Sequence, residues 1–155
     1  MKYQKYIIIL ICILIALTLW FIWANSMEST AQSKAKSTDL LAKLQPVLDA
    51  ALGPGKVTEH ALRKTAHFLE FTLLGIELRL LFWLLGQRGI QGQANTLFAA
   101  LAAAVADETI QSHTGRGSQL KDVCLDFSGA VIGSLALFLL ALLAVYLRKR
   151  RKHPR

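Results

Sequence analysis

Four long apolar segments limit what this chain can fold into. The first, residues 7–23, has no charged residue, and the others cover 59–86, 94–111 and 122–147. An α-helix of about 20 residues crosses a hydrocarbon layer of about 30 Å. Hydrophobic residues make up 54% of the chain and charged residues 18%, which is too apolar for a soluble domain of this size. The sequence therefore predicts an all-α membrane protein with four transmembrane helices in a bundle.

These segments divide the chain into four parts. We expect a first transmembrane anchor over residues 6–25, an extracytoplasmic linker with an amphipathic helix over 26–58, a three-helix membrane core over 59–147 and a basic cytoplasmic tail over 148–155. Residues 24–26 loosely resemble a cleavage site, so a signal peptide is the alternative to a retained anchor. The aromatic residues Trp20, Phe21 and Trp23 before that site favour the anchor.

The linker contains a stretch with helical spacing of apolar residues. Over residues 39–52 these are Leu40, Leu44, Val47, Leu48 and Ala51. Thr38 or Asp39 would cap the helix, Pro46 would bend it, and the glycines at 53 and 55 would end it. Such a helix would lie on the membrane surface, cover the bundle or form a plain soluble linker.

The charge distribution indicates the orientation of the chain. The net charge is +8, and six of the last eight residues are Lys or Arg. This basic tail, together with Lys2 and Lys5, places both termini in the cytoplasm and predicts a multi-pass protein of the cell membrane. The linker lysines, Lys34, Lys36, Lys43 and Lys56, oppose this assignment but are more spread out. No aromatic residues are interleaved with the tail charges, so nucleic-acid binding is not expected.

Four spans bring three helix ends to the face opposite the termini. These are the start of the second span, the end of the third and the start of the fourth. The polar residues that can converge there are Arg63, Lys64, His67, Glu70, Asp107, Glu108, Gln111, Arg116, Asp122 and Asp126. At 100° per residue, the second span places His67, Glu70 and Glu77 on one stripe, which should face other helices. Ionisable groups at this depth are expensive, so the cluster is a candidate functional site.

Small residues predict how the helices pack. The third span is rich in alanine, which predicts a packing helix at the centre of the bundle. On the fourth span, Gly129 and Gly133 form a GxxxG step on the same face as Asp122 and Asp126. We expect this face to pack against the alanine-rich helix. Cys12 and Cys124 lie in or beside apolar runs and are interpreted as buried, unpaired residues.

The cluster is compatible with several kinds of chemistry. His67 and the carboxylates can bind a divalent cation, although no full ligand set is evident and no cofactor or metal is assigned. Glu70 or Glu108 can act as a general base, and Arg63, Lys64 and Arg116 can hold a phosphate or carboxylate. The groups can also simply neutralise one another. The chain lacks HExxH, GxSxG, Walker A and CxxC patterns, so catalytic residues are not assigned.

Several short elements together resemble the VanZ-like family of small membrane proteins. They are Lys-Thr-Ala-His-Phe-Leu-Glu-Phe at 64–71 with Leu74-Gly75, Asp107-Glu108 with Gln111, Gly115-Arg116 with Ser118, and Asp122 with Gly129 and Gly133. The resemblance covers residues 63–133. It implies a multi-helix membrane domain whose biochemical activity is generally unassigned. The member that gives the family its name is linked to low-level resistance to teicoplanin, which acts on a cell-wall precursor outside the membrane. Family members often carry asparagine near the position of Asp126.

Our leading hypothesis is an accessory membrane protein without enzymatic activity. Its outward-facing cluster would engage a membrane lipid or a lipid-linked or amphiphilic envelope molecule. One alternative is a metal-assisted membrane hydrolase or transferase that acts on a lipid headgroup. Another is a structural partner of a membrane protein complex, for which the alanine and glycine faces are the supporting feature.

Overall fold

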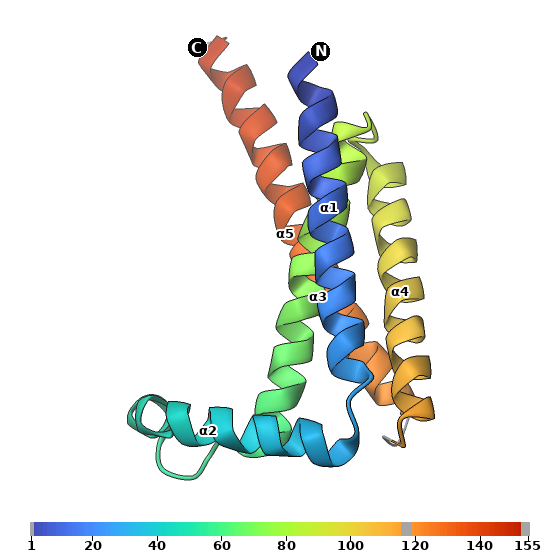
Figure 1. Cartoon of the computed structure of the whole chain (residues 1–155). Coiled ribbons are helices and arrows are strands. Elements are labelled where there is room, and N and C mark those ends of the chain that lie inside the picture. The colour runs from blue at the N-terminus through green and yellow to red at the C-terminus, as the bar shows by residue number, and fades with distance from the viewer. Residues whose placement is uncertain (1, 116–118, 153–155) are drawn as a thin grey trace.

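The computed structural model describes residues 2–115 and 119–152, which form five α-helices and no β-strand (Figure 1). The helices are α1 (Lys2–Ser26), α2 (Thr30–Leu52), α3 (Glu59–Leu84), α4 (Ile90–His113) and α5 (Leu120–Lys152). The all-α prediction is thus confirmed for the described part of the chain.

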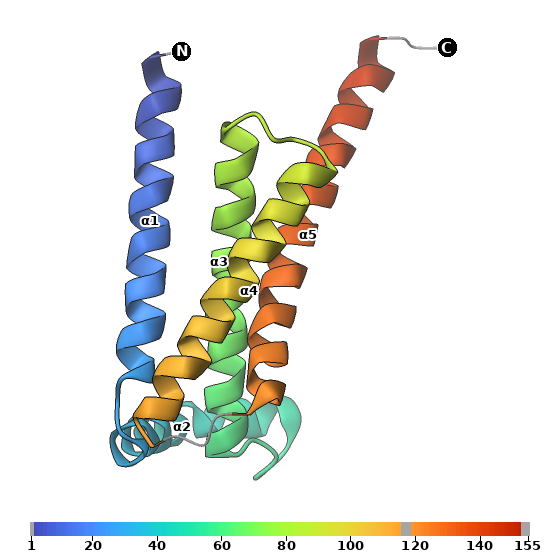
Figure 2. The same ribbon diagram turned by 90° about the vertical axis from the view of Figure 1, so that its right-hand side faces the viewer.

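Four of the helices run alongside one another, and the fifth lies across one end of them. Helices α1, α3, α4 and α5 form the bundle, and α2 crosses the end where α1 stops and α5 starts (Figure 1, Figure 2). The start of α1 and the end of α5 both lie at the opposite end, on different sides of the bundle (Figure 2). The connections therefore alternate between the two ends, so that α3 and α5 start, and α4 finishes, near α2.

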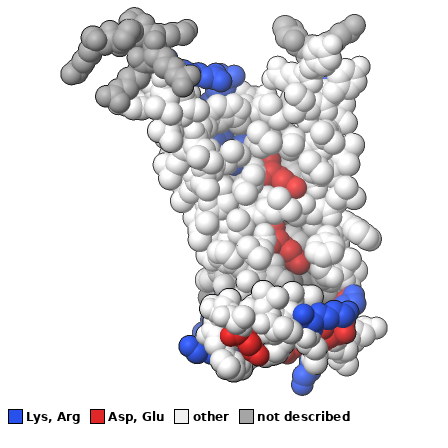
Figure 3. Space-filling view, turned by 90° about the vertical axis from the view of Figure 1, so that its left-hand side faces the viewer, with Lys and Arg blue, Asp and Glu red and all other residues white. Residues whose placement is uncertain are grey.

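Two helices are long and apolar enough to cross a membrane. They cover Tyr3–Ser26 and Leu120–Arg148, and most of their residues are not buried inside the monomer. Charged side chains gather at the end of the molecule where α2 lies, while most of the visible flank above them is uncharged (Figure 3). An apolar flank that no protein covers is typical of a surface that faces lipid. These features indicate a membrane protein.

Helix α3, and not the alanine-rich α4, is the central helix. It packs against each of the other four helices, whereas α4 packs against α1, α3 and α5. The core between them contains the fully buried side chains of Phe71 and Leu74 from α3, together with Ala100 and Ala104 from α4. The alanines bring α4 close to this core, but α3 supplies the large side chains, which explains why the sequence prediction of an alanine helix at the centre was wrong.

The glycine face of α5 packs against α3 rather than against α4, which corrects a second prediction. A Cβ atom at Gly129 would overlap the carbonyl oxygen of Phe68, and one at Gly133 would overlap that of Thr72. Gly75 on α3 is equally close to the backbone of Ala130. Glycine on both helices therefore allows direct backbone contact. The partner was predicted incorrectly because a face of small residues does not specify which helix it will meet.

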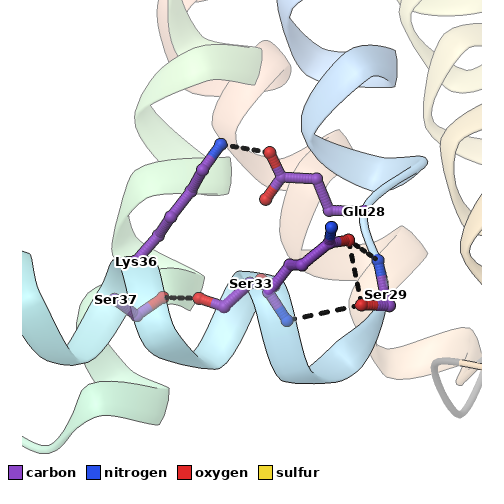
Figure 4. A network of polar contacts seen from close by, with 6 residues as sticks. Glu28, Ser29, Ser33, Lys36 and Ser37 are labelled. Atoms are coloured by element: carbon purple, nitrogen blue, oxygen red, sulfur yellow. Dashed lines mark hydrogen bonds and ion pairs between the residues drawn. The ribbon is translucent and has the colours of Figure 1, made fainter.

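Helix α2 begins nine residues earlier than the apolar spacing predicted, at Thr30. Ser29, not Thr38 or Asp39, is the N-cap, and it exchanges hydrogen bonds with Gln32 at 3.4 and 3.1 Å. Such a capping box satisfies backbone donors that the first turn leaves unpaired. Lys36, in the second turn of α2, forms an ion pair with Glu28, which precedes the N-cap (Figure 4). As predicted, the helix ends before Gly53, whose φ of 97° few other residues adopt.

Several other boundaries differ from the sequence prediction. Helix α3 ends at Leu84, α4 begins at Ile90 rather than at residue 94, and α5 begins at Leu120. The start of α4 contains polar residues that have tertiary contacts: Gln93 is buried and donates a hydrogen bond to Ser134 on α5 at 2.9 Å.

Cys12 and Cys124 are unpaired, but both are exposed rather than buried, because each lies on the outer face of its helix.

Candidate functional site

The end of the bundle near α2 holds most of the polar residues singled out in the sequence. Helix α3 contributes Lys64, His67 and Glu70, α4 contributes Asp107, Glu108 and Gln111, and α5 contributes Asp122 and Asp126. Arg116 lies outside the described residues. Each helix carries these groups in the half that is nearer to α2, so the alternation of the connections brings them to one end.

Three side chains from three helices meet at the centre of this cluster. One potential ligand atom from each of His67, Asp107 and Asp126 lies within 4.8 Å of the other two. Asp107 is fully buried and Asp126 is 2% exposed, while the side chain of His67 is 14% exposed. An imidazole and two carboxylates thus lie close together in a largely buried position.

Neighbouring polar groups on the same helix lie beside two of these side chains. The Nδ1 atom of His67 lies 3.5 Å from Oε2 of Glu70, one turn further along α3. On α4, Nε2 of Gln111 donates a hydrogen bond to Oδ2 of Asp107 at 2.6 Å. Both contacts join residues on one helix at a spacing of three or four, which places them on the same face.

Glu108 closes the other side of the cluster. It is 4% exposed, and its Oε1 accepts a hydrogen bond from the backbone N–H of Gln119 at 2.7 Å. Its Oε2 atom is buried and has no hydrogen-bond partner among the described residues. Through Oε1, Glu108 fixes the backbone just before α5 and thereby the position of the first turn of that helix.

Basic residues form the rim of the cluster. Lys64 donates a hydrogen bond to Oδ1 of Asp122 at 2.7 Å, which ties α3 to α5. Arg63 lies 3.1 Å from Glu59 on its own helix and 3.3 Å from His60. These side chains are only partly buried, so their charges remain accessible from outside the bundle.

A cavity of about 330 Å³ lies between the rim and the cluster. Its walls include Arg63, Lys64 and His67 from α3 and Asp122, Leu125 and Asp126 from α5. A second cavity of about 110 Å³ lies on the side of α1 and α2 and shares His67 and Arg63 with the first. His67 therefore separates two hollows, and Asp126 forms part of the wall of the larger one.

Sequence reasoning missed the contribution of α1 to this end of the bundle. Ser26 is fully buried, and its Oγ accepts a hydrogen bond from Nε2 of Gln111 at 3.3 Å. Its carbonyl oxygen accepts another from the hydroxyl of Thr114 at 3.2 Å. A serine that ends an apolar run carries no signal in the sequence for such a role. The last residue of α1 is thus bonded to the helix that supplies Asp107.

Two further buried charged residues lie away from the cluster. Glu77, on the predicted polar stripe of α3, faces α1 and accepts a hydrogen bond from Thr18 at 3.1 Å. Arg79 is fully buried and donates to the carbonyl oxygens of Gln87 and Arg88 at 3.1 and 2.9 Å. Arg79 thereby satisfies carbonyl groups in the connection between α3 and α4 that have no helical partner.

A comparison with models of protein families supports the resemblance found in the sequence. The model of the VanZ/LLP1 family matches residues 7–144. Searches of curated proteins and of solved structures found no match. The matched residues include the polar cluster, the glycine contact between α3 and α5 and nearly all of α1. Because the match extends over most of its length, the chain belongs to the VanZ/LLP1 family.

Proposed function

We propose that this protein is a membrane-embedded binding protein for an anionic amphiphile of the cell envelope, either a membrane lipid or a lipid-linked molecule. The observation that carries the proposal is the cavity of about 330 Å³, whose rim has Arg63 and Lys64 and whose wall has apolar Leu125. A basic rim beside an apolar wall suits a molecule with a charged headgroup and a hydrocarbon chain.

In this proposal, α3 and α4 cross the membrane together with α1 and α5. Both termini lie in the cytoplasm, and the cavity opens outward at headgroup depth. The basic tail supports this orientation, and the gathering of charged side chains at the end near α2 supports a headgroup depth for the cavity (Figure 3). The linker lysines favour the opposite membrane orientation. The two orientations are distinguished by fusing green fluorescent protein or alkaline phosphatase to the C-terminus. Fluorescence without phosphatase activity is expected, and the reverse result would refute the outward-facing cavity.

Helix α2 lies where such a headgroup would arrive. Its Leu40, Leu44 and Val47 side chains are exposed, and the helix crosses the end of the bundle (Figure 1). A helix with an apolar face in this position can lie in the membrane interface. It would then place the mouth of the cavity beside the headgroup layer rather than in bulk water.

The direct test is to identify lipids that remain bound after gentle purification. The full-length protein is purified in a mild detergent, and bound lipids are extracted and quantified by mass spectrometry. We expect one class of anionic amphiphile to be enriched over the membrane average. Lys64→Met and Arg63→Met should each reduce its amount about tenfold, the effect of losing a charge-assisted contact of about 1.4 kcal/mol.

Arg88→Met is the matched control, because Arg88 is an exposed arginine in the connection between α3 and α4, at the other end of the bundle. It should retain the lipid at the level of the unmodified protein. Equal lipid content in all variants, at unchanged thermal stability, would refute the binding proposal.

A finer form of the proposal links the ligand to glycopeptide action. It predicts that expression of the protein lowers teicoplanin susceptibility and that Lys64→Met abolishes this effect.

A further inference from the structure

We propose that His67, Asp107 and Asp126 bind one divalent transition-metal ion, of the Zn²⁺ or Mn²⁺ class, at the inner end of the larger cavity. This inference is independent of whether the protein binds a lipid. It rests on the distances between three side chains from three different helices, which the sequence placed at the same end of the bundle but could not resolve to one site.

The first argument is the geometry of the donor atoms. The three potential ligand atoms lie within 4.8 Å of one another. Ligands on opposite sides of a metal with bonds of about 2.1 Å lie about 4.2 Å apart, and those at a tetrahedral angle lie closer. Small rotations of these side chains are therefore sufficient to form a coordination sphere. Water or an anionic ligand in the cavity can fill the remaining positions.

The second argument is the way in which His67 is held. Its Nδ1 atom faces Oε2 of Glu70 at 3.5 Å. A histidine that binds a metal usually donates its other ring N–H to a carboxylate or a carbonyl group, which orients the ring. In the proposed site, Nδ1 faces Glu70 and Nε2 binds the metal. Gln111 orients Asp107 in a similar manner through a hydrogen bond of 2.6 Å.

The third argument comes from Asp126, whose carboxylate is close to the other two ligands. Asp126 is 2% exposed and lines the larger cavity. Four other carboxylates, those of Glu70, Asp107, Glu108 and Asp122, lie near enough to repel its charge. A divalent cation bound between Asp126 and Asp107 would offset this repulsion.

The ligand set indicates the class of metal. Imidazole nitrogen favours Zn²⁺ and other transition metals, whereas Mg²⁺ and Ca²⁺ prefer oxygen ligands throughout. One imidazole with two carboxylates suits Zn²⁺, and Mn²⁺ also accepts such a mixture. Lys64, which also lines the cavity, is paired with Asp122 at 2.7 Å.

The test is a metal titration of the full-length protein in detergent. The sample is stripped with a chelator, and Zn²⁺, Mn²⁺, Mg²⁺ and Ca²⁺ are added separately in a calorimeter. We expect one equivalent of Zn²⁺ or Mn²⁺ to bind, with no comparable binding of Mg²⁺ or Ca²⁺. His67→Ala and Asp126→Asn should abolish this binding, and Glu70→Gln should weaken it about 10- to 100-fold, as is typical for an orienting partner.

Matched controls use the same residue types outside the cluster. His113→Ala changes an exposed histidine of α4, and Asp39→Asn changes an exposed aspartate of α2; both should bind metal like the unmodified protein. If His67→Ala does not fold, the visible absorption of Co²⁺ added to Asp126→Asn and to the unmodified protein decides the point. The absence of one-equivalent binding, or unchanged binding in folded His67→Ala and Asp126→Asn, would overturn the proposal. Loss of metal binding with retained lipid would leave the proposed function intact, so the two can fail separately.

Discussion

The Nζ atom of Lys64 on α3 lies 2.7 Å from Oδ1 of Asp122 on α5, and this ion pair joins helices that are 58 residues apart at that point. It stands at the rim of the cavity, next to the first turn of α5. Its side chains are 37% and 26% exposed. A partly exposed pair of this kind contributes about 1 kcal/mol or less to stability.

Reversal of one partner of this pair should destabilise the fold, and reversal of both should restore it. Lys64→Glu places two carboxylates opposite each other and should lower the midpoint of thermal unfolding in detergent. Lys64→Glu combined with Asp122→Lys should recover most of the loss, because the attraction is re-formed with its direction exchanged. A double variant that is no more stable than Lys64→Glu would show that the pair does not join the helices.

Gly129→Ala should disrupt the contact between α3 and α5. The added Cβ would overlap the carbonyl oxygen of Phe68, and backbone atoms cannot move aside as the end of a side chain can. Overpacking of this kind costs about 1–3 kcal/mol, which thermal unfolding in detergent will detect. Gly89→Ala is the control, because a Cβ there meets no atom within 4 Å. Equal stability of the two variants would contradict the close contact.

Arg79→Met should destabilise the protein by removing both hydrogen bonds to the connection between α3 and α4. Each hydrogen bond to a charged group is worth about 1.5–3 kcal/mol, so a large fall in the unfolding midpoint is expected. Arg79→Lys should recover only part of it, because an ammonium group does not have the two-pronged geometry of a guanidinium. Arg88→Met, in which the accepting carbonyl is kept, should change stability by about 0.5 kcal/mol or less.

The mature protein should retain α1. Ser26 accepts hydrogen bonds from Gln111 and Thr114, and Thr18 donates one to Glu77. Cleavage after Ser26 would remove Thr18 and Ser26 together with the rest of α1, and Glu77 would lose the hydrogen bond from Thr18. Intact-protein mass spectrometry should therefore give a mass of about 17.1 kDa. A shorter species that begins at Met27 would contradict this prediction. In the protein that retains α1, Thr18→Val should lower the midpoint of thermal unfolding, because it removes the hydrogen bond to Glu77.

The sequence was sufficient to predict the helices and the end of the bundle at which the polar groups occur. The apolar segments have the lengths of helices, and short connections reverse the chain direction, so His67, Asp107 and Asp126 were expected at one end. The capping box of Ser29 and Gln32 was also readable, although the apolar spacing of α2 drew attention to a start near Asp39. In that case a local hydrogen-bond signal was more informative than periodicity.

The tertiary partners could not be predicted in this way. The glycine face of α5 was visible in the sequence, but its partner depends on how α3 and α4 pack around it. Gly129 therefore packs against the backbone of Phe68 on α3 rather than against an alanine of α4. Likewise, nothing near Arg79 indicates that its side chain reaches the carbonyl groups of Gln87 and Arg88. Such contacts follow from the three-dimensional arrangement of whole helices and leave little trace in local patterns.

The glycine contact also limits how this protein can open. Where α3 and α5 touch backbone to backbone at Gly75, Gly129 and Gly133, separation of the two helices would break this close contact along its length. We therefore expect the cavity to widen through displacement of α2 or α4, which also line it, and cross-linking α3 to α5 should leave the entry of a large molecule unhindered.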